Sequence, residues 1–122
     1  MINITICDDD KHFLKLLKQK ITSYLANNNQ LSYTIKCFNS IETLLEYNIS
    51  KVNILFLDVR FKAMSGIDAA KILRELSSYF ILIFVSSYIE YAPAGYSVNA
   101  FRYILKEQID ILSLIHISEP TR

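Results

Sequence analysis

The alternation of apolar and polar residues along the chain predicts five short strands with helices between them. Apolar runs fit strands at residues 2–7, 33–38, 53–57, 80–85 and 100–105. The runs at 53–57 and 80–85 are almost continuously apolar, which is typical of central parallel strands that are covered on both faces.

The first helix has the clearest pattern. Asp10 is a candidate N-cap, because its carboxylate can accept from the free amides at a helix start. Apolar residues follow it at four-residue spacing and predict an amphipathic helix that ends at the asparagines 27–29; they are Phe13, Leu17, Ile21 and Leu25.

The later helices are marked by shorter signals. Ser40 can cap a short helix, and Ser65 with Asp68 resembles a capping box at the start of a longer one. Residues 88–98 form a weaker helical segment because they contain Pro93. Strands that alternate with helices in this way predict an α/β fold, an open and doubly wound parallel sheet.

In such sheets the functional crevice lies at the carboxyl ends of the strands, so the residues that follow each strand are of interest. The second strand ends in ordinary turn residues, Asn39 and Ser40. The other four strands end in reactive or charged residues. Aspartates 8–10 follow the first strand, Asp58 the third, Ser86 and Ser87 the fourth, and Lys106 the fifth.

Several carboxylates at one place repel each other, by about 4 kcal/mol for two unit charges about 4 Å apart at an effective dielectric constant of 20. Such a cluster raises a pKa or binds a cation, and oxygen ligands without His or Cys favour Mg²⁺. A lysine and a serine hydroxyl nearby can bind phosphate oxygens. The set therefore predicts a phosphoryl-transfer site in which a carboxylate is the nucleophile.

Each of these residues also has a plainer interpretation. Asp10 can be only a helix cap, and a single aspartate after a strand is usually a turn residue. A lone Lys106 would be solvated, and Ser86 alone would indicate nothing. Their common position at one edge of the predicted sheet favours the functional interpretation.

Composition narrows the class of protein. The chain has 122 residues, about half of them apolar, which fits one globular domain. Its net charge of +1 does not indicate the basic surface that a nucleic-acid-binding protein needs. Lys11, Lys15, Lys18 and Lys20 are expected to form a solvated helix face. No segment fits a signal peptide or a membrane helix, so we expect a cytoplasmic protein without membrane contact.

Two cysteines, Cys7 and Cys37, both fall in strand-like runs and form no CxxC pair. We interpret them as buried free thiols in a reducing compartment. A disulfide between them stays open as an alternative.

Five motifs together resemble the receiver domain of two-component response regulators over residues 1–107. They are ICDDD at 6–10, LFLDVR at 55–60, MSGIDAAK at 64–71, IFVSSYIEYA at 83–92 and NAFRYILK at 99–106. The resemblance implies a flavodoxin-like (βα)₅ sheet with strand order 2-1-3-4-5. It also implies a phospho-acceptor that catalyses only its own phosphorylation and dephosphorylation, not an enzyme acting on other substrates.

The resemblance assigns roles by position. Asp58 is the expected acceptor of a phosphoryl group from a histidine kinase, and Mg²⁺ is held by Asp9, Asp58, the backbone carbonyl of Arg60 and, through water, Asp8. Ser86 and Lys106 contact the phosphoryl group. Tyr103 is the aromatic switch that changes the face formed by the fourth helix and fifth strand; its plainer alternative is an aromatic side chain packed at the surface.

The segments YIEYA and VNAFRYILK resemble the subgroup with a LytTR-type DNA-binding output. This implies a transcription regulator that contacts DNA only through that output domain and can form a homodimer on phosphorylation.

Residues 112–122, LSLIHISEPTR, resemble a translated sequencing adapter. We therefore expect a receiver domain at 1–111 with a truncated last helix, a non-native tail, and no output domain. Sequencing the parent DNA past residue 111 tests this expectation.

The chain departs from the family pattern at two positions. Glu107 follows Lys106 where most receivers have proline, and a cis peptide is not expected because it costs about 2.5–4 kcal/mol at a non-proline residue. Whether Lys106 still reaches the phosphate stays open. Lys62 replaces a common proline in the loop after Asp58, which predicts a more mobile loop.

Two other functions remain as alternatives. One is a pseudo-receiver that binds partners without being phosphorylated, for which Glu107 leaves room. The other is a phosphatase that uses an aspartate nucleophile, suggested by Asp8 and Asp10 after the first strand, although it leaves Asp58 unused.

Arg60 lies two residues beyond the predicted acceptor and is expected to sit over the site. We predict that it changes the rate of dephosphorylation by ordering the attacking water. The lifetime of phosphorylated Asp58 in Arg60→Ala measures this, and an unchanged half-life contradicts it.

Overall fold

The computed structural model describes residues 1–26 and 32–109, which form a five-stranded sheet and the helices that cover it. The strands are β1 (Ile2–Cys7), β2 (Tyr33–Phe38), β3 (Ile54–Leu57), β4 (Ile81–Ser86) and β5 (Arg102–Leu105). The α-helices are α1 (Lys11–Ala26), α2 (Ile41–Glu46), α3 (Gly66–Leu76) and α4 (Ala92–Tyr96), and single 3₁₀ turns cover Ile49–Lys51, Ile89–Tyr91 and Lys106–Gln108. Within the described residues, no helix has the length and apolar character needed to cross a membrane.

All strand pairs are parallel, and the strand order is β2-β1-β3-β4-β5, which confirms the predicted doubly wound sheet. Cys7 pairs with Leu57 in the next strand, and Ser86 pairs with Leu105. The residues that follow β1, β3 and β5 therefore meet at one edge. The predicted last helix and the adapter-like segment at 112–122 lie outside the described residues.

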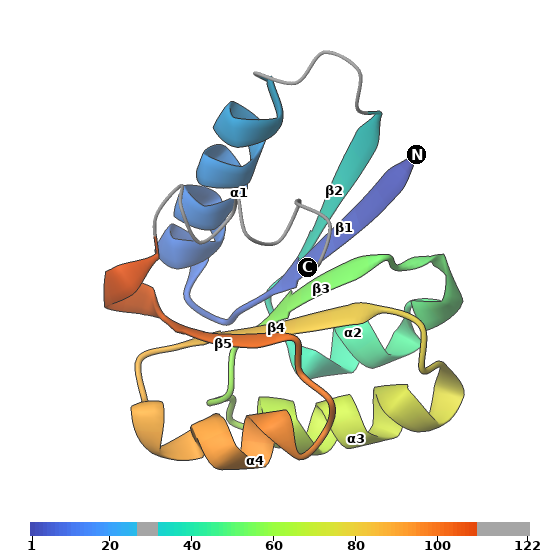
Figure 1. Ribbon diagram of the computed structural model, residues 1–122, viewed down its shortest axis with the longest axis vertical. Helices are drawn as coiled ribbons and strands as arrows, with labels where there is room; N and C mark the ends of the chain where they lie inside the picture. The colour runs from blue at the N-terminus through green and yellow to red at the C-terminus, as the bar shows by residue number, and fades with distance from the viewer. Residues whose placement is uncertain (27–31, 110–122) are drawn as a thin grey trace.

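The two faces of the sheet are covered by different helices, as Figure 1 shows: α1 lies on one side and α2, α3 and α4 lie on the other. On the first side, Phe13, Leu17 and Ile21 pack with side chains of the sheet such as Ile6 and Ile83. A separate buried cluster joins the opposite face of the sheet to α2 and α3. Burial on both faces explains why the runs at 53–57 and 80–85 are apolar throughout.

The predicted helix caps are confirmed. The Asp10 carboxylate accepts from the amides of His12 and Phe13, at 3.0 and 3.1 Å. The hydroxyl of Ser40 accepts from the Thr43 amide, and the hydroxyl of Ser65 accepts from the Asp68 amide. The plainer interpretation of Asp10 as a cap therefore holds, because its carboxylate faces the first turn of α1.

Three local predictions need correction. The helix expected at 88–98 is a 3₁₀ turn followed by the five-residue α4, because Pro93 lies in the first turn of that helix. The last strand begins at Arg102, after Asn99, whose φ of 61° interrupts an extended chain. Cys37 is exposed, not buried, because β2 is an edge strand, whereas Cys7 is buried; both thiols are free.

Arg74 fixes the loop between α4 and β5. Its guanidinium donates to the carbonyls of Val98, Phe80 and Asn99, at 3.1, 2.8 and 2.9 Å, and lies 4.1 Å from the centroid of the Phe80 ring. Charge-assisted bonds to several carbonyls hold this loop against α3 and so set where β5 begins.

Candidate functional site

The ends of β1 and β3 bring Asp8 and Asp58 to the same edge of the sheet. The Asp58 amide donates to the carbonyl of Cys7 at 3.1 Å, so the ladder between the two strands continues to the acidic residues. Asp8 and Asp58 are 2% and 6% exposed, whereas Asp9 is exposed. Two buried carboxylates next to an open one are an unusual arrangement, because aspartate is rarely buried without a partner.

Backbone groups hold both buried carboxylates in place. Asp58 Oδ1 accepts from the Val59 amide at 2.7 Å, and Asp8 Oδ1 accepts from the Asp10 amide at 2.9 Å. Gly66 lies against the main chain of Asp58, and a Cβ at this position would lie 1.8 Å from the Asp58 carbonyl oxygen. Only glycine allows α3 to begin so close to the acidic residue.

Lys106 reaches both buried carboxylates. Its Nζ lies 2.9 Å from Asp8 Oδ2 and 3.4 Å from Asp58 Oδ2. The described residues contain no cis peptide, so Lys106 attains this position with a trans bond before Glu107, as predicted. Its ammonium also lies 4.6 Å from the centre of the Phe13 ring, a cation–π contact.

Burial and charge set the ionisation of these groups. Burial raises the pKa of Asp8 to about 6; hydrogen bonding to Lys106 opposes the rise, and the charge of Asp58 adds to it. Burial also raises the pKa of Asp58, and the charge of Lys106 opposes this. Burial alone would lower the pKa of Lys106, but its interactions with both aspartates outweigh burial and raise it.

Ser86, the predicted phosphoryl contact, and Tyr103, the predicted aromatic switch, both hydrogen-bond to the backbone of Tyr88. Ser86 is fully buried and its Oγ accepts from the Tyr88 amide at 3.1 Å. The Tyr103 hydroxyl donates to the carbonyl of Tyr88, and the Tyr103 ring packs 5.9 Å from that of Phe84. Burial raises the pKa of Tyr103, and a hydrogen bond with Ser86 opposes that rise.

Arg60 occupies the other side of Tyr88. Its guanidinium lies 4.8 Å from the centre of the Tyr88 ring, so the exposed side chain stacks on the loop that follows β4. The expected roles of the Arg60 carbonyl as a metal ligand and of its side chain in hydrolysis stay predictions.

The three acidic side chains can share one cation. Asp8, Asp9 and Asp58 each offer a carboxylate oxygen, and these oxygens lie within 4.8 Å of one another. Mg²⁺ prefers a few carboxylate ligands and keeps several waters, which suits a cluster with one exposed member. The donor set therefore fits this ion.

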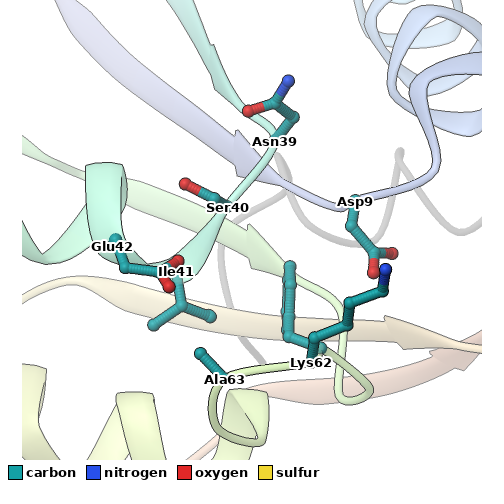
Figure 2. A pocket seen from close by; sticks show the side chains of 8 residues that line it. Asp9, Asn39, Ser40, Ile41, Glu42, Lys62 and Ala63 are labelled. Atoms are coloured by element: carbon teal, nitrogen blue, oxygen red, sulfur yellow. The ribbon is translucent and has the colours of Figure 1, made fainter.

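A pocket of about 540 Å³ adjoins the exposed side of the acidic cluster. It lies between the ends of β1 and β2 and the loop after β3, and its lining includes Asp9, Ser40, Glu42, Phe61 and Lys62. Figure 2 shows the Lys62 ammonium turned toward the Asp9 carboxylate, with Glu42 farther along the pocket. The pocket gives the cluster a solvent-accessible side.

Two residues of this site were not identified from the sequence. Phe13 was predicted only as a core residue of the first helix, and its contact with Lys106 depends on how α1 packs against β5. Tyr88, which contacts Arg60, Ser86 and Tyr103, belongs to the motif at residues 83–92, but that motif assigned it no role in the site.

The profile of the response regulator receiver domain matches residues 4–116 of the chain. An uncharacterized response regulatory protein of Vibrio cholerae is 28% identical over 106 residues, and the sensory transduction protein LytT of Enterococcus faecalis is 29% identical over 105. These matches cover 87% and 86% of this chain but only 43% and 42% of the relatives. The chain thus spans about two fifths of their length.

Solved structures share the fold. A CheY-like receiver domain protein from Methanospirillum hungatei superposes with a TM-score of 0.79 at 19% identity, covering 96% of this chain and 90% of that one. The response regulator TrrA from Thermotoga maritima, solved in complex with Mg²⁺ and BeF, gives 0.78 at 21% identity, with 96% and 97% covered. The shared fold agrees with the strand order described above.

Asp8→Asn tests the electrostatic cost of the cluster. Burial raises the pKa of Asp8 in the folded protein from its ordinary value of 3.8 to about 6. Ionisation of this group therefore destabilises the fold above pH 6, and the cost disappears as the pH falls toward 4. In EDTA at pH 7.5, we expect urea denaturation to show Asp8→Asn more stable than wild type by about 1–3 kcal/mol.

The difference should shrink at pH 5, where Asp8 is mostly protonated in the folded wild type. Asp68→Asn, at an exposed carboxylate on α3, is the matched control and should change little. An Asp8→Asn variant that is less stable than wild type at pH 7.5 would contradict this account of the site.

Proposed function

Because the chain belongs to the receiver domain family of two-component response regulators, we propose that it accepts a phosphoryl group on Asp58. The observation that carries the proposal is the placement of Asp58 beside Asp8, Asp9 and Lys106 at the carboxyl edge of the sheet. A carboxylate nucleophile, a cluster of oxygen ligands and an ammonium are the groups that phosphoryl transfer to a protein needs.

In the proposed reaction, a carboxylate oxygen of Asp58 attacks phosphorus, and the bond from phosphorus to the donor breaks with its electron pair. The donor is a phosphohistidine or a small acyl phosphate, and the product is an acyl phosphate on Asp58. The Val59 amide orients the Asp58 carboxylate throughout, since it donates to Oδ1. Lys106, already 3.4 Å from Asp58 Oδ2, stabilises the added negative charge.

Asp8, Asp9 and Asp58 would hold Mg²⁺, with the carbonyl of Arg60 as a further ligand. When bound, this ion neutralises charge on the phosphoryl oxygens. Ser86 would donate its hydroxyl to the phosphoryl group while its Oγ keeps the bond from the Tyr88 amide. A shift of Ser86 would change the space available to Tyr103, and that change would alter the surface formed by α4 and β5.

The proposed partner is a histidine kinase. The proposed output is a LytTR-type DNA-binding domain that regulates transcription, and the proposed location of the protein is the cytoplasm. The relative named LytT supports this choice of output. In this proposal the chain contacts DNA only through that domain, phosphorylation favours a homodimer, and the only chemistry of the domain is its own phosphorylation and dephosphorylation.

The two alternatives differ in what they require of the aspartates. A phosphatase that uses Asp8 and Asp10 needs the Asp10 carboxylate free, but this group accepts from two amides of α1. The pseudo-receiver was suggested by Glu107, which left the reach of Lys106 open, but Nζ lies 3.4 Å from Asp58 Oδ2. Both observations favour the phospho-acceptor.

The function is tested by incubating the 122-residue chain with Mg²⁺ and acetyl phosphate and measuring its intact mass. We expect one phosphoryl group per chain, lost in Asp58→Asn and in EDTA, because the acceptor and the cation are both required. Asp10→Asn is the matched control: it retains a helix cap and should be phosphorylated like wild type.

Repeated turnover of a phosphomonoester that depends on Asp10 would favour the phosphatase instead. A folded protein that takes up no phosphoryl group would favour the pseudo-receiver and contradict the proposal.

A further inference from the structure

A second lysine faces the acidic cluster from another part of the chain. Lys106 approaches the buried carboxylates of Asp8 and Asp58 from the end of β5. Lys62 belongs to the loop after β3 and shares the pocket of about 540 Å³ with Asp9, the exposed member of the cluster. Figure 2 shows its ammonium turned toward the Asp9 carboxylate.

The charges around the cluster are nearly balanced by these two lysines. The three carboxylates of the cluster and these two ammonium groups together carry a single negative charge before any ion binds, with Glu42, farther along the pocket, left out of this sum. A divalent cation that enters the cluster reverses the sign of this local charge and meets repulsion from both lysines. Lys106 is tied to the buried carboxylates, whereas Lys62 is exposed, so its charge can be removed without disturbing buried contacts.

We propose that Lys62 is a built-in competitor of the divalent cation. Its ammonium stabilises the Asp9 carboxylate electrostatically and thereby weakens cation binding by Asp8, Asp9 and Asp58. The inference rests on the proposed function, because it takes these three side chains as the cation ligands.

The position of Lys62 separates it from the other exposed lysines. Those on α1, such as Lys18, do not line this pocket. Glu42 also lines it and could attract the ammonium, but Figure 2 places the amino end of Lys62 on the Asp9 side. Lys62 therefore points toward a proposed cation ligand.

This arrangement links cation binding to the phosphoryl donor. A donor brings a phosphoryl group with its own negative charge to the cluster, and that charge offsets the repulsion between the cation and Lys62. The cation then binds more tightly to the complex with the donor than to the free domain. Lys62 is a positioning residue in this scheme, since it acts through Asp9 and the ion.

The test is direct measurement of cation affinity without any phosphodonor. Mn²⁺ serves as the probe because it accepts the same oxygen ligands as Mg²⁺, and its free concentration is read from its electron paramagnetic resonance signal. We expect Lys62→Gln to lower the Kd for Mn²⁺ by about threefold to tenfold. Raising KCl to about 0.5 M should reduce this difference, because exposed charges are screened.

Two variants control for other causes. Lys62→Arg keeps the positive charge, and Lys18→Gln makes the same change in net charge on the exposed face of α1. Both should bind Mn²⁺ like wild type. Asp9→Asn should weaken binding in every background, which identifies the signal as that of this site.

The proposal is overturned if Lys62→Gln binds Mn²⁺ no more tightly than wild type, or if Lys18→Gln tightens binding by the same factor. In either case an Asp9-dependent signal leaves the proposed function standing. If Asp9→Asn binds Mn²⁺ like wild type, the cation site itself is wrong, and both proposals fall.

Discussion

Two carboxylates, Asp8 and Asp58, are buried at the edge of a parallel sheet within reach of one ammonium group. The Lys106 ammonium lies 2.9 Å from the first and 3.4 Å from the second, and this bridge makes their burial tolerable. Without it, two like charges would be buried side by side at a high cost. The strand order, the trans bond before Glu107 and the contact with Phe13 all serve to place this one group.

The remaining features of the site surround this bridge. Gly66 lets α3 begin against the main chain of Asp58, and the Val59 amide fixes the carboxylate. Tyr88 joins the loops on the other side, because its backbone contacts both Ser86 and Tyr103. The exposed side of the cluster is less constrained: Asp9 opens to a pocket that also contains Lys62. A rigid buried half and an open half suit a site that binds and releases a charged group.

The sequence predicted the features that depend on the type of residue at a given position in the chain. Apolar runs predicted the strands, and the residues after them predicted the cluster, because parallel strands all end at one edge. The prediction for Cys37 failed because its exposure depends on β2 being an edge strand, which strand pairing decides. The helix predicted at 88–98 was too long, although Pro93, which interrupts it, is visible in the sequence. The contacts of Phe13 and Tyr88 could not be predicted, because they join segments far apart in the chain.

The central claim is that Asp58, held between the acidic cluster and Lys106, is the residue that carries the phosphoryl group. Reduction of the phosphorylated chain with borohydride, followed by peptide mass spectrometry, tests it at the level of single residues. An acyl phosphate is reduced to an alcohol, so the account predicts homoserine at position 58 and unmodified aspartate at positions 8 and 9. Homoserine at position 8 or 9, or at none of the three, would contradict it.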